Sequence, residues 1–377
     1  MDAILLVSPS FSRGGAEEQL LALARGLRGR YMVRVLLPKL PATASLIDDL
    51  HSSQIAVSPL AVPPTSPRLQ ALRDTWVLSR TLQNPRPALI HVVLPDVLES
   101  MTVVASAWMT CLPYVLGFQS VPPTLRLAGA RGGVRRRARR MLFRAAAARV
   151  TVSRANVRRL AALFGMRGDE FGVIPPGIDV ARFAAAPGMP RNALDLPGPG
   201  PVVMVVARLS AEKGLADFLR AASLVGTTPR PNFVLVGDGP LRPELERQAI
   251  DLGLAGRVVF LGYRRDIPAL LAGADVIVLP SLHEGLPLAV LEALAVGRPV
   301  VATAVDGTAE LIDHESTGLL VRPGNPAELA EAIIRVLNDA SLRERLGRHG
   351  RARAAAFDQS AMIDRTVHVY ERVIRHG

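Results

Sequence analysis

Short runs of apolar, often β-branched residues alternate with longer segments of helical period, most clearly in the second half of the chain. Strands are predicted there at Val202–Ala207, Phe233–Val236, Val258–Leu261, Val276–Leu279, Pro299–Ala302 and Gly318–Val321. Helices are predicted at Leu215–Val225, Leu241–Leu252, Ile267–Ala272, Leu288–Val296 and Pro326–Leu337. This alternation is typical of an α/β fold with a parallel sheet that helices cover on both faces.

The first half shows the same alternation, beginning with the apolar run Ala3–Val7. Gly14 and Gly15 follow it and lead into an amphipathic helix, so the chain opens with a strand, a glycine turn and a helix. Further strands are predicted at Val33–Leu37, Leu89–Val93, Pro113–Phe118, Arg149–Val152 and Phe171–Ile174. A second α/β domain is therefore expected here.

The pattern predicts two Rossmann-like domains in tandem. The first covers residues 1–186, a linker rich in Pro and Gly covers 187–200, and the second domain covers 201–359. A last helix over 360–377 is expected to pack back across the linker. Two such domains leave a central cleft that faces the carboxyl ends of both sheets, which is where open α/β sheets bind ligands.

Composition narrows the class of protein. A single cysteine, Cys111, excludes a disulfide framework and favours a reducing, cytoplasmic location, and the first residues carry no secretory signal. Aromatic residues make up 4% of the chain, which argues against stacking on nucleic-acid bases. Ser100–Gln119 is uncharged, but a helix followed by a buried strand explains it better than a membrane span.

The net charge of +12 is concentrated in one segment. Ser100–Gly168 contains thirteen arginines and no Asp or Glu, whereas the rest of the chain is nearly neutral. On the predicted helix over Arg131–Arg149, one face carries Val134, Ala138, Met141, Leu142 and Ala145. Arginines beside an amphipathic helix suit an anionic membrane surface or a phosphorylated lipid acceptor, bound through Arg126–Arg159. A solvated arginine face is the open alternative.

The segment after the strand Val276–Leu279 is the first candidate for chemistry. Glu284, Gly285, Leu286 and Pro287 precede a helix that Pro287 is predicted to open, and the N–H groups of that helix start form an anion site. Glu292 lies among apolar neighbours, so its carboxylate is expected to need a partner such as ligand hydroxyls. A glutamate at the solvent edge of the helix is the alternative.

The segment after the strand Val202–Ala207 is the second candidate. Arg208 stands at the strand end and Lys213 near the next helix, and two cations there suit a diphosphate both in binding and as it departs. Only Lys39 and Lys213 are lysines, against 43 arginines. That bias makes a lysine at position 213 conspicuous, although two solvated surface cations would fit the same pattern. No nucleophile triad, metal-binding spacing or Walker loop occurs, so no cofactor or metal is expected.

Together these segments resemble the retaining glycosyltransferases of family 4, which have the GT-B fold of two Rossmann-like domains. The resemblance rests on Glu284 with Glu292, on Arg208-Leu209-Ser210 with Lys213-Gly214, and on Val236–Pro240. Gly14–Glu17 and Ile174–Asp179 resemble segments of the family's first domain. It implies sugar transfer from a UDP- or GDP-sugar, without a protein nucleophile or a metal, to a lipid-linked or polyprenyl-phosphate-linked acceptor at the cytoplasmic membrane face.

The resemblance also assigns roles to residues. Arg208 and Lys213 would hold the donor diphosphate, and Glu284 with the amides of Gly285–Leu288 would contact the sugar and phosphate. Glu292 would bind the ribose, with Gly14 and Gly15 near the phosphates. The implied base pocket is Tyr263 and Ile267.

In one position the chain departs from the family. Many relatives carry a histidine after the strand that matches Pro113–Phe118, and here Gln119 follows that strand. Gln119 can hydrogen-bond to a sugar but cannot act as an acid or base. His91, expected at the end of another strand, is a second possible sugar contact. A nucleotide-sugar-binding protein with little catalysis, and a transferase with a soluble acceptor, therefore stay open as alternatives.

Overall fold

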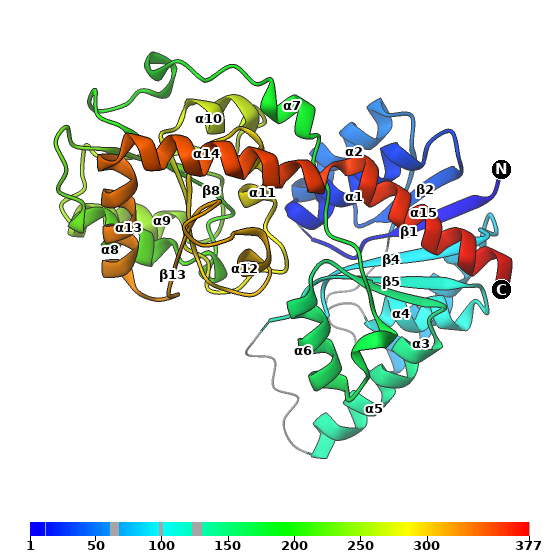
Figure 1. Cartoon of the computed structure of the whole chain (residues 1–377). Coiled ribbons are helices and arrows are strands. Elements are labelled where there is room, and N and C mark those ends of the chain that lie inside the picture. Colours follow the sequence, from blue (N-terminus) through cyan, green and yellow to red (C-terminus); the bar gives the residue numbers. More distant parts are fainter. Residues whose placement is uncertain (12, 61–67, 98–100, 123–129, 377) are drawn as a thin grey trace. The chain divides into compact units, whose positions relative to one another are not determined.

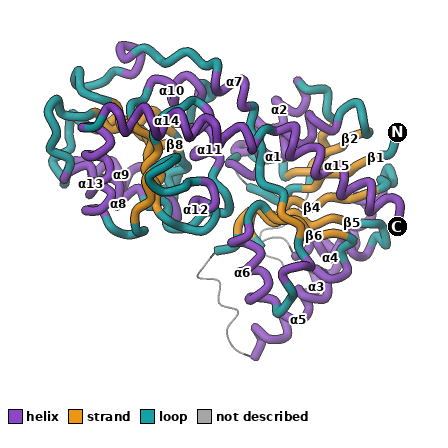
Figure 2. The backbone as a smooth tube through the Cα atoms, viewed as in Figure 1, coloured by secondary structure: helices purple, strands orange, loops and turns teal. Residues whose placement is uncertain are grey.

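The computed structural model describes residues 1–11, 13–60, 68–97, 101–122 and 130–376. It divides into two compact units. The first consists of Met1–Gly177 and Gln359–Gly377, and the second of Ile178–Asp358. Each unit is built on one parallel sheet with helices on both faces, which confirms the predicted fold class (Figures 1 and 2).

The sheet of the first unit has seven strands in the order β3-β2-β1-β4-β5-β6-β7. These are β1 (Ala3–Val7), β2 (Met32–Leu37), β3 (Ala56–Pro59), β4 (Leu89–Asp96), β5 (Tyr114–Ser120), β6 (Ala148–Thr151) and β7 (Gly172–Val173). Every pairing between neighbours is parallel.

Helices cover this sheet in two layers. They are α1 (Gly15–Leu27), α2 (Ala44–Ser52), α3 (Arg68–Gln83), α4 (Met101–Met109), α5 (Ala130–Ala145), α6 (Arg154–Phe164) and α15 (Gln359–His376). Successive strand residues point to opposite faces. Ile4 and Leu6 therefore pack with α1, α2 and α15, whereas Leu5 and Val7 pack with α3, α4, α5 and α6.

The sheet of the second unit has six strands in the order β10-β9-β8-β11-β12-β13. These are β8 (Val202–Val206), β9 (Asn232–Val236), β10 (Val258–Gly262), β11 (Val276–Leu279), β12 (Val300–Thr303) and β13 (Leu319–Val321). The helices are α7 (Val180–Ala184), α8 (Leu215–Leu224), α9 (Arg242–Asp251), α10 (Ile267–Gly273), α11 (Leu288–Ala295), α12 (Thr308–Leu311), α13 (Pro326–Asn338) and α14 (Ala340–Ala354).

Each sheet has a point where the strand order reverses. In the first unit it lies between β1 and β4, and in the second between β8 and β11. Loops that leave the carboxyl ends of two such strands diverge to opposite faces of the sheet, and ligands bind in the crevice between them. The loop after β8 carries Arg208 and Lys213, and the loop after β11 carries Glu284. The fold therefore brings the two predicted segments to one switch point.

The boundaries of the units differ from the predicted ones. The chain passes from the first unit to the second after Gly177, and residues 187–200, expected as a linker, belong to the second unit. Leu194 in this segment is buried against the core of the second unit. Proline and glycine indicate a segment without regular secondary structure, but such a segment can belong to a domain as well as link two domains. The last helix starts at Gln359 and belongs to the first unit, where Tyr370 is fully buried.

The uncharged segment Ser100–Gln119 forms α4 and β5 where the structure describes it, which confirms a helix followed by a strand. Phe118 and Val104 from these two elements pack in one core cluster. Among the described residues, no helix has the length and apolar character needed to cross a bilayer.

Candidate functional site

The loops after β8 and β11 lie against each other at the switch point of the second unit. The N–H of Leu282 donates to the carbonyl oxygen of Glu212 at 2.8 Å. Gly214 adopts a φ of +61°, and a Cβ atom there would stand 2.1 Å from the carbonyl oxygen of Pro280. Only glycine allows this approach without displacing backbone. The contact sets the distance between the two loops.

Lys213 and Glu284 form an ion pair across these loops. The Lys213 Nζ lies 2.7 Å from Glu284 Oε1, and the same oxygen accepts a hydrogen bond of 2.7 Å from Ser281 Oγ. The side chains are 22% and 9% exposed, so the pair is largely shielded from water. An ammonium has three donors, and the carboxylate uses one of them. Lys213 can therefore hold Glu284 and bind an anion at the same time.

Arg208 is held beside this pair by Glu212. The guanidinium donates to Glu212 Oε1 at 2.8 Å, and Ser210 Oγ donates to the same carboxylate. Burial favours the neutral acid, but the hydrogen bonds from Arg208 and Ser210 outweigh it and lower the pKa of Glu212 to about 2. The carboxylate is thus charged at neutral pH and orients a guanidinium that is half-exposed.

A third loop, after β12, supports Glu284 from the other side. The N–H of Glu284 donates to Asp306 Oδ2 at 3.3 Å. A Cβ atom on Gly307 would come within 2.0 Å of the carbonyl oxygen of Gly285. Sequence reasoning missed Asp306, Gly307 and Ser281, although Asp306 follows a predicted strand, and that position could have flagged it.

Helix α11 begins directly after the loop that follows β11. The helix starts at Leu288, as its apolar pattern predicted, but Pro287 is the N-cap in extended conformation, with φ −75° and ψ 121°, and not the first helical residue. The first N–H groups of a helix have no acceptor within it and favour an anion in front of them. Gly285 and Leu286 lie immediately before this start, and Glu292 is partly buried on the first two turns.

The remaining predicted donor residues lie around the same sheet edge. Gly237, with a φ of +133°, packs the loop after β9 so close to Ala207 that a Cβ atom would meet its carbonyl oxygen at 2.0 Å. Tyr263 follows β10 and is 53% exposed, and Ile267 is the first residue of α10. No hydrogen bond or ion pair links these last two residues to the Lys213–Glu284 pair in the part of the second unit that the structure describes. Their role in a base pocket stays a prediction.

The arrangement is suited to binding a polyanion. A shielded ammonium, a guanidinium fixed by a charged carboxylate and the start of α11 all belong to the two loops of one switch point. Such groups neutralise phosphate charge and stabilise the additional negative charge of a departing diphosphate. Among the described residues, no three His, Cys, Asp or Glu side chains gather so that they could hold a metal ion.

Gly14 and Gly15 lie in the first unit at the start of α1. Gly14 is the N-cap of the helix, and its N–H donates to Glu17 Oε2 at 2.9 Å. Arg13 forms ion pairs with Glu18 at 2.7 Å and with Asp49 at 2.6 Å, which fixes the loop to α1 and α2. The predicted strand, glycine turn and helix are therefore confirmed, and their contact with donor phosphates stays a prediction.

The structure places the two possible sugar contacts of the first unit differently. Gln119 lies near the carboxyl end of β5 and is partly exposed. His91 is the third residue of β4, not at a strand end, and its side chain is buried. The His91 Nδ1 lies 2.5 Å from the hydroxyl of Tyr370 on α15, and the Nε2 faces Gly117. His91 thus fastens α15 to the sheet, and its buried imidazole lines a small cavity together with Gln119.

Burial lowers the pKa of His91 to about 4, so acidification should destabilise the first unit. The unfolded chain takes up a proton at His91 near pH 6.5, whereas the folded protein does so only near pH 4. The contribution of His91 to the free energy of unfolding is therefore fully present above pH 6.5. It decreases by up to about 3 kcal/mol as the pH falls to 4. We expect His91→Gln to flatten this part of the curve of unfolding free energy against pH. His51→Gln, at an exposed histidine, is the control, and an unchanged slope in His91→Gln would contradict the assignment.

Two family models match the chain. One describes a glycosyl transferase 4-like domain and matches residues 14–177, and the other describes glycosyl transferases group 1 and matches residues 190–353. The two matches correspond to the two α/β units and include the predicted site segments. The chain therefore belongs to the GT-B glycosyltransferases of the family 4 type, as the resemblance of its motifs predicted.

Similar proteins of known activity have diverse substrates. The alpha-D-kanosaminyltransferase of Streptomyces kanamyceticus is 36% identical over 177 residues, which cover 46% of this chain and 46% of that protein. The UDP-Gal:alpha-D-GlcNAc-diphosphoundecaprenol alpha-1,3-galactosyltransferase of Escherichia coli is 36% identical over 180 residues, with 46% of each chain covered. The matched part of the chain thus spans about half the length of these curated relatives.

A solved structure has the same fold over nearly the full length of this chain. HepE from Anabaena, in complex with UDP-glucose, superimposes with a TM-score of 0.83 at 25% sequence identity. The match covers 99% of this chain and 100% of that chain.

Proposed function

We propose that the protein transfers a sugar from a UDP- or GDP-sugar to a lipid-linked or polyprenyl-phosphate-linked acceptor, with retention of configuration at the anomeric carbon. The observation that carries this proposal is the Lys213–Glu284 ion pair at the switch point between β8 and β11, with Arg208 beside it. The complex of the Anabaena protein with UDP-glucose supports the donor class. The diphosphoundecaprenol substrate of the E. coli relative supports the acceptor class.

The proposed reaction breaks the bond between the anomeric carbon and the diphosphate and forms one to an acceptor oxygen on the same face of the sugar. The acceptor proton passes to an oxygen of the leaving diphosphate, so no protein base is needed. Lys213, Arg208 and the N–H groups at the start of α11 stabilise the charge that develops on the diphosphate. Glu284, fixed by Lys213 and Ser281, has its second carboxylate oxygen available to orient sugar hydroxyls.

The exposed arginines support a location at the cytoplasmic membrane face. Arg135, Arg136 and Arg137 on α5 are exposed. Arg126, the first arginine of the predicted basic surface, lies outside the described residues. An attraction between arginines and anionic headgroups weakens as salt screens it, so binding to anionic vesicles is expected to fall with ionic strength.

The direct test is a transfer assay with purified protein, a panel of UDP- and GDP-sugars and a polyprenyl-diphosphate-linked acceptor. We expect transfer by the wild type and its loss in Glu284→Ala, because the sugar then lacks its carboxylate partner and Lys213 its ion pair. Glu244→Ala, at an exposed glutamate on α9, should leave transfer unchanged. If no nucleotide-sugar is bound, hydrolysed or transferred, the proposal fails.

Gln119 favours one alternative, a protein that binds nucleotide-sugars with little catalysis. Its amide cannot act as a general acid or base at neutral pH. His91 is buried, with its Nδ1 2.5 Å from the hydroxyl of Tyr370. Nucleotide-sugar binding without detectable transfer to any acceptor would support this alternative, whereas transfer that Glu284→Ala abolishes would exclude it.

A further inference from the structure

Exposed large apolar side chains are concentrated on three neighbouring helices of the first unit. Of the fourteen exposed large apolar residues among those described, six lie on α3, α4 and α5. These six are Trp76, Val77, Trp108, Met109, Val134 and Met141. Exposed apolar residues that cluster in this way usually mark a surface that contacts a membrane or another protein, whereas single scattered ones have no such meaning.

The two tryptophans are the strongest part of this observation. The chain has only two, and both are about half-exposed, Trp76 at 53% and Trp108 at 47%. The guanidinium of Arg80 lies 5.2 Å from the centre of the Trp76 ring. Tryptophan is largely buried in most folded proteins, and its other frequent environment is the boundary between water and lipid.

The three helices share one outer surface. α3 and α4 are joined by hydrogen bonds of 3.0 Å from Ser106 Oγ to the Thr75 carbonyl and from Gln83 Nε2 to the Thr110 carbonyl. The buried residues of α3, α4 and α5 belong to one core cluster on one face of the sheet. Their exposed side chains therefore point away from the sheet on the same side, where the three helices lie together in Figures 1 and 2.

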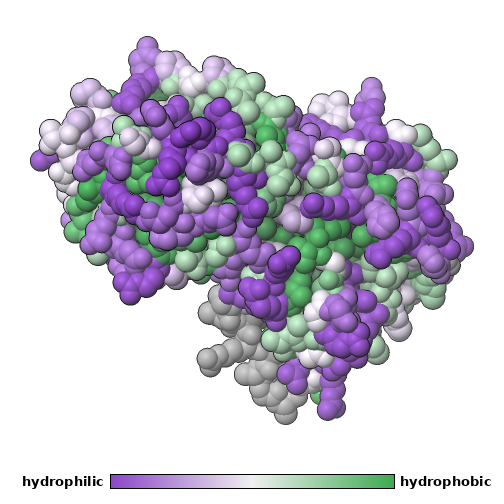
Figure 3. Space-filling model, viewed as in Figure 1, coloured by the Kyte–Doolittle hydropathy of each residue, from purple (hydrophilic) through white to green (hydrophobic). Residues whose placement is uncertain are grey.

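Helix α5 adds charge to this surface. Val134, Ala138 and Met141 are spaced by four and three residues, so they lie on one side of the helix, and all three are exposed. The predicted apolar face of α5 therefore meets solvent at these three residues, whereas Leu142 and Phe143 pack against the core. The exposed Arg135 and Arg137 flank the apolar stripe, and Arg136 lies on the opposite side of the helix. Over the region where α5 lies, Figure 3 shows hydrophilic residues beside hydrophobic ones.

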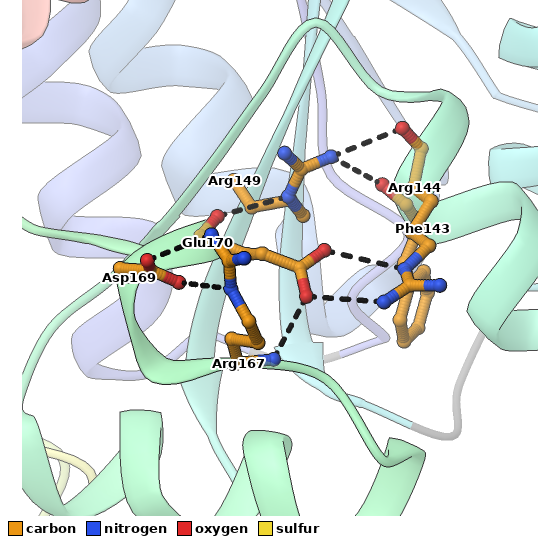
Figure 4. Close-up of polar contacts among 6 residues, drawn as sticks. All are labelled: Phe143, Arg144, Arg149, Arg167, Asp169 and Glu170. Atoms are coloured by element: carbon orange, nitrogen blue, oxygen red, sulfur yellow. Dashed lines mark hydrogen bonds and ion pairs between the residues drawn. The ribbon is translucent and has the colours of Figure 1, made fainter.

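The carboxyl end of α5 is firmly held. Arg149 Nη1 donates to the carbonyl oxygens of Phe143 at 2.9 Å and Arg144 at 3.2 Å, and its Nε donates to the Glu170 carbonyl at 3.0 Å (Figure 4). The Glu170 carboxylate accepts from Arg144 and from the backbone N–H of Arg167. These arginines serve the fold, and the exposed Arg80, Arg135 and Arg137 supply positive charge to the outer surface.

We propose that this outer surface of α3, α4 and α5, named here the docking face, seats the protein on an anionic lipid bilayer. Trp76, Trp108 and the exposed methionines enter the interfacial region, and Arg135 and Arg137 bind lipid phosphates. The inference rests on the proposed function, because a lipid-linked acceptor lies in the bilayer that the docking face would contact. The occupant is a lipid surface because the charge is complementary: α4 and α5 carry no acidic residue, and α3 carries one, Asp74, beside three arginines.

Intrinsic fluorescence tests this directly, because every tryptophan of the native protein lies on the docking face. Vesicles of phosphatidylglycerol and phosphatidylcholine should shift the emission to shorter wavelength, and bromine-labelled acyl chains should quench it. Pure phosphatidylcholine vesicles should produce a smaller effect. Trp76→Phe and Trp108→Phe each leave one tryptophan to report on its own helix, and both single reporters should respond.

Binding energies give a second readout. Trp76→Ser with Trp108→Ser should weaken vesicle binding about tenfold or more, because two large apolar side chains no longer leave water. Leu224→Ser, at a residue 57% exposed on α8 of the second unit, should leave it unchanged. An unchanged melting temperature and unchanged nucleotide binding would show that the double variant is folded.

Three results would overturn the docking face. These are vesicle binding without spectral shift or quenching, equal losses in the double variant and in Leu224→Ser, and a spectral shift that rises with protein concentration without lipid. The last would assign the surface to a second copy of the chain. Nucleotide-sugar turnover, measured without vesicles, tests the proposed function separately: turnover with no lipid response removes the docking face alone.

Discussion

Replacing Lys213 with alanine is expected to lower kcat/KM for the nucleotide-sugar by about 100- to 1,000-fold, the usual effect of removing one donor that stabilises a developing anion. Lys213 lies 2.7 Å from Glu284, so the variant loses a phosphate ligand and also leaves a buried carboxylate without its cation. Steady-state kinetics with donor hydrolysis as readout measures the effect. Lys213→Arg should recover part of it, because the charge returns with a different geometry.

The chain provides a matched control for this substitution. Lys39, the other lysine, is exposed and lies in the first unit, so Lys39→Ala should change kcat/KM by less than about twofold. If Lys213→Ala and Lys39→Ala have the same kinetics, Lys213 is a solvated surface cation and has no role at the switch point.

Replacing Gly214 with alanine is expected to cost about 2–5 kcal/mol of unfolding free energy and to abolish nucleotide binding. The residue has a φ of +61°, which costs alanine about 1–2 kcal/mol. Its Cβ would stand 2.1 Å from the Pro280 carbonyl, and relieving that overlap costs about 1–3 kcal/mol more. The relief separates the two loops, so Lys213 and Glu284 move apart.

Gly253 separates the two contributions. Its φ is +68°, but a Cβ atom there meets nothing within 4 Å. Gly253→Ala should therefore lose only about 1–2 kcal/mol in urea unfolding and keep nucleotide binding. Equal losses at both glycines would mean that the close approach of the loops after β8 and β11 does not determine the site.

The sequence predicted most strands because buried parallel strands are short, nearly continuous apolar runs. It missed β3 (Ala56–Pro59), a strand of four residues at the sheet edge, because two of the four are a serine and a proline. It also missed α14 (Ala340–Ala354), where arginine and glycine obscure the helical period. The buried face of α5 could not be identified because Val134 and Met141 are as regularly spaced as a core stripe, and exposure depends on neighbouring helices.

For the candidate site, the rule that ligands bind at strand ends was enough to select Arg208, Lys213 and Glu284. It could not show that the loops of Lys213 and Glu284, 71 residues apart, lie side by side, because that depends on β8 pairing with β11. Asp306 was missed for a similar reason. Its contact with the Glu284 N–H requires β12 to pair with β11. The pattern of apolar residues predicts where strands lie but not the order in which they pair.

The central claim is that the Lys213–Glu284 switch point binds a nucleotide-sugar. A thermal-shift screen over UDP- and GDP-sugars, run on the wild type and on Lys213→Ala, tests it most directly. At a hundred times its dissociation constant, the right donor should stabilise the wild type by about 2.7 kcal/mol and raise its melting temperature. Lys213→Ala should show no shift at the same concentration. Equal shifts in both proteins, or no shift with any donor, would contradict the claim.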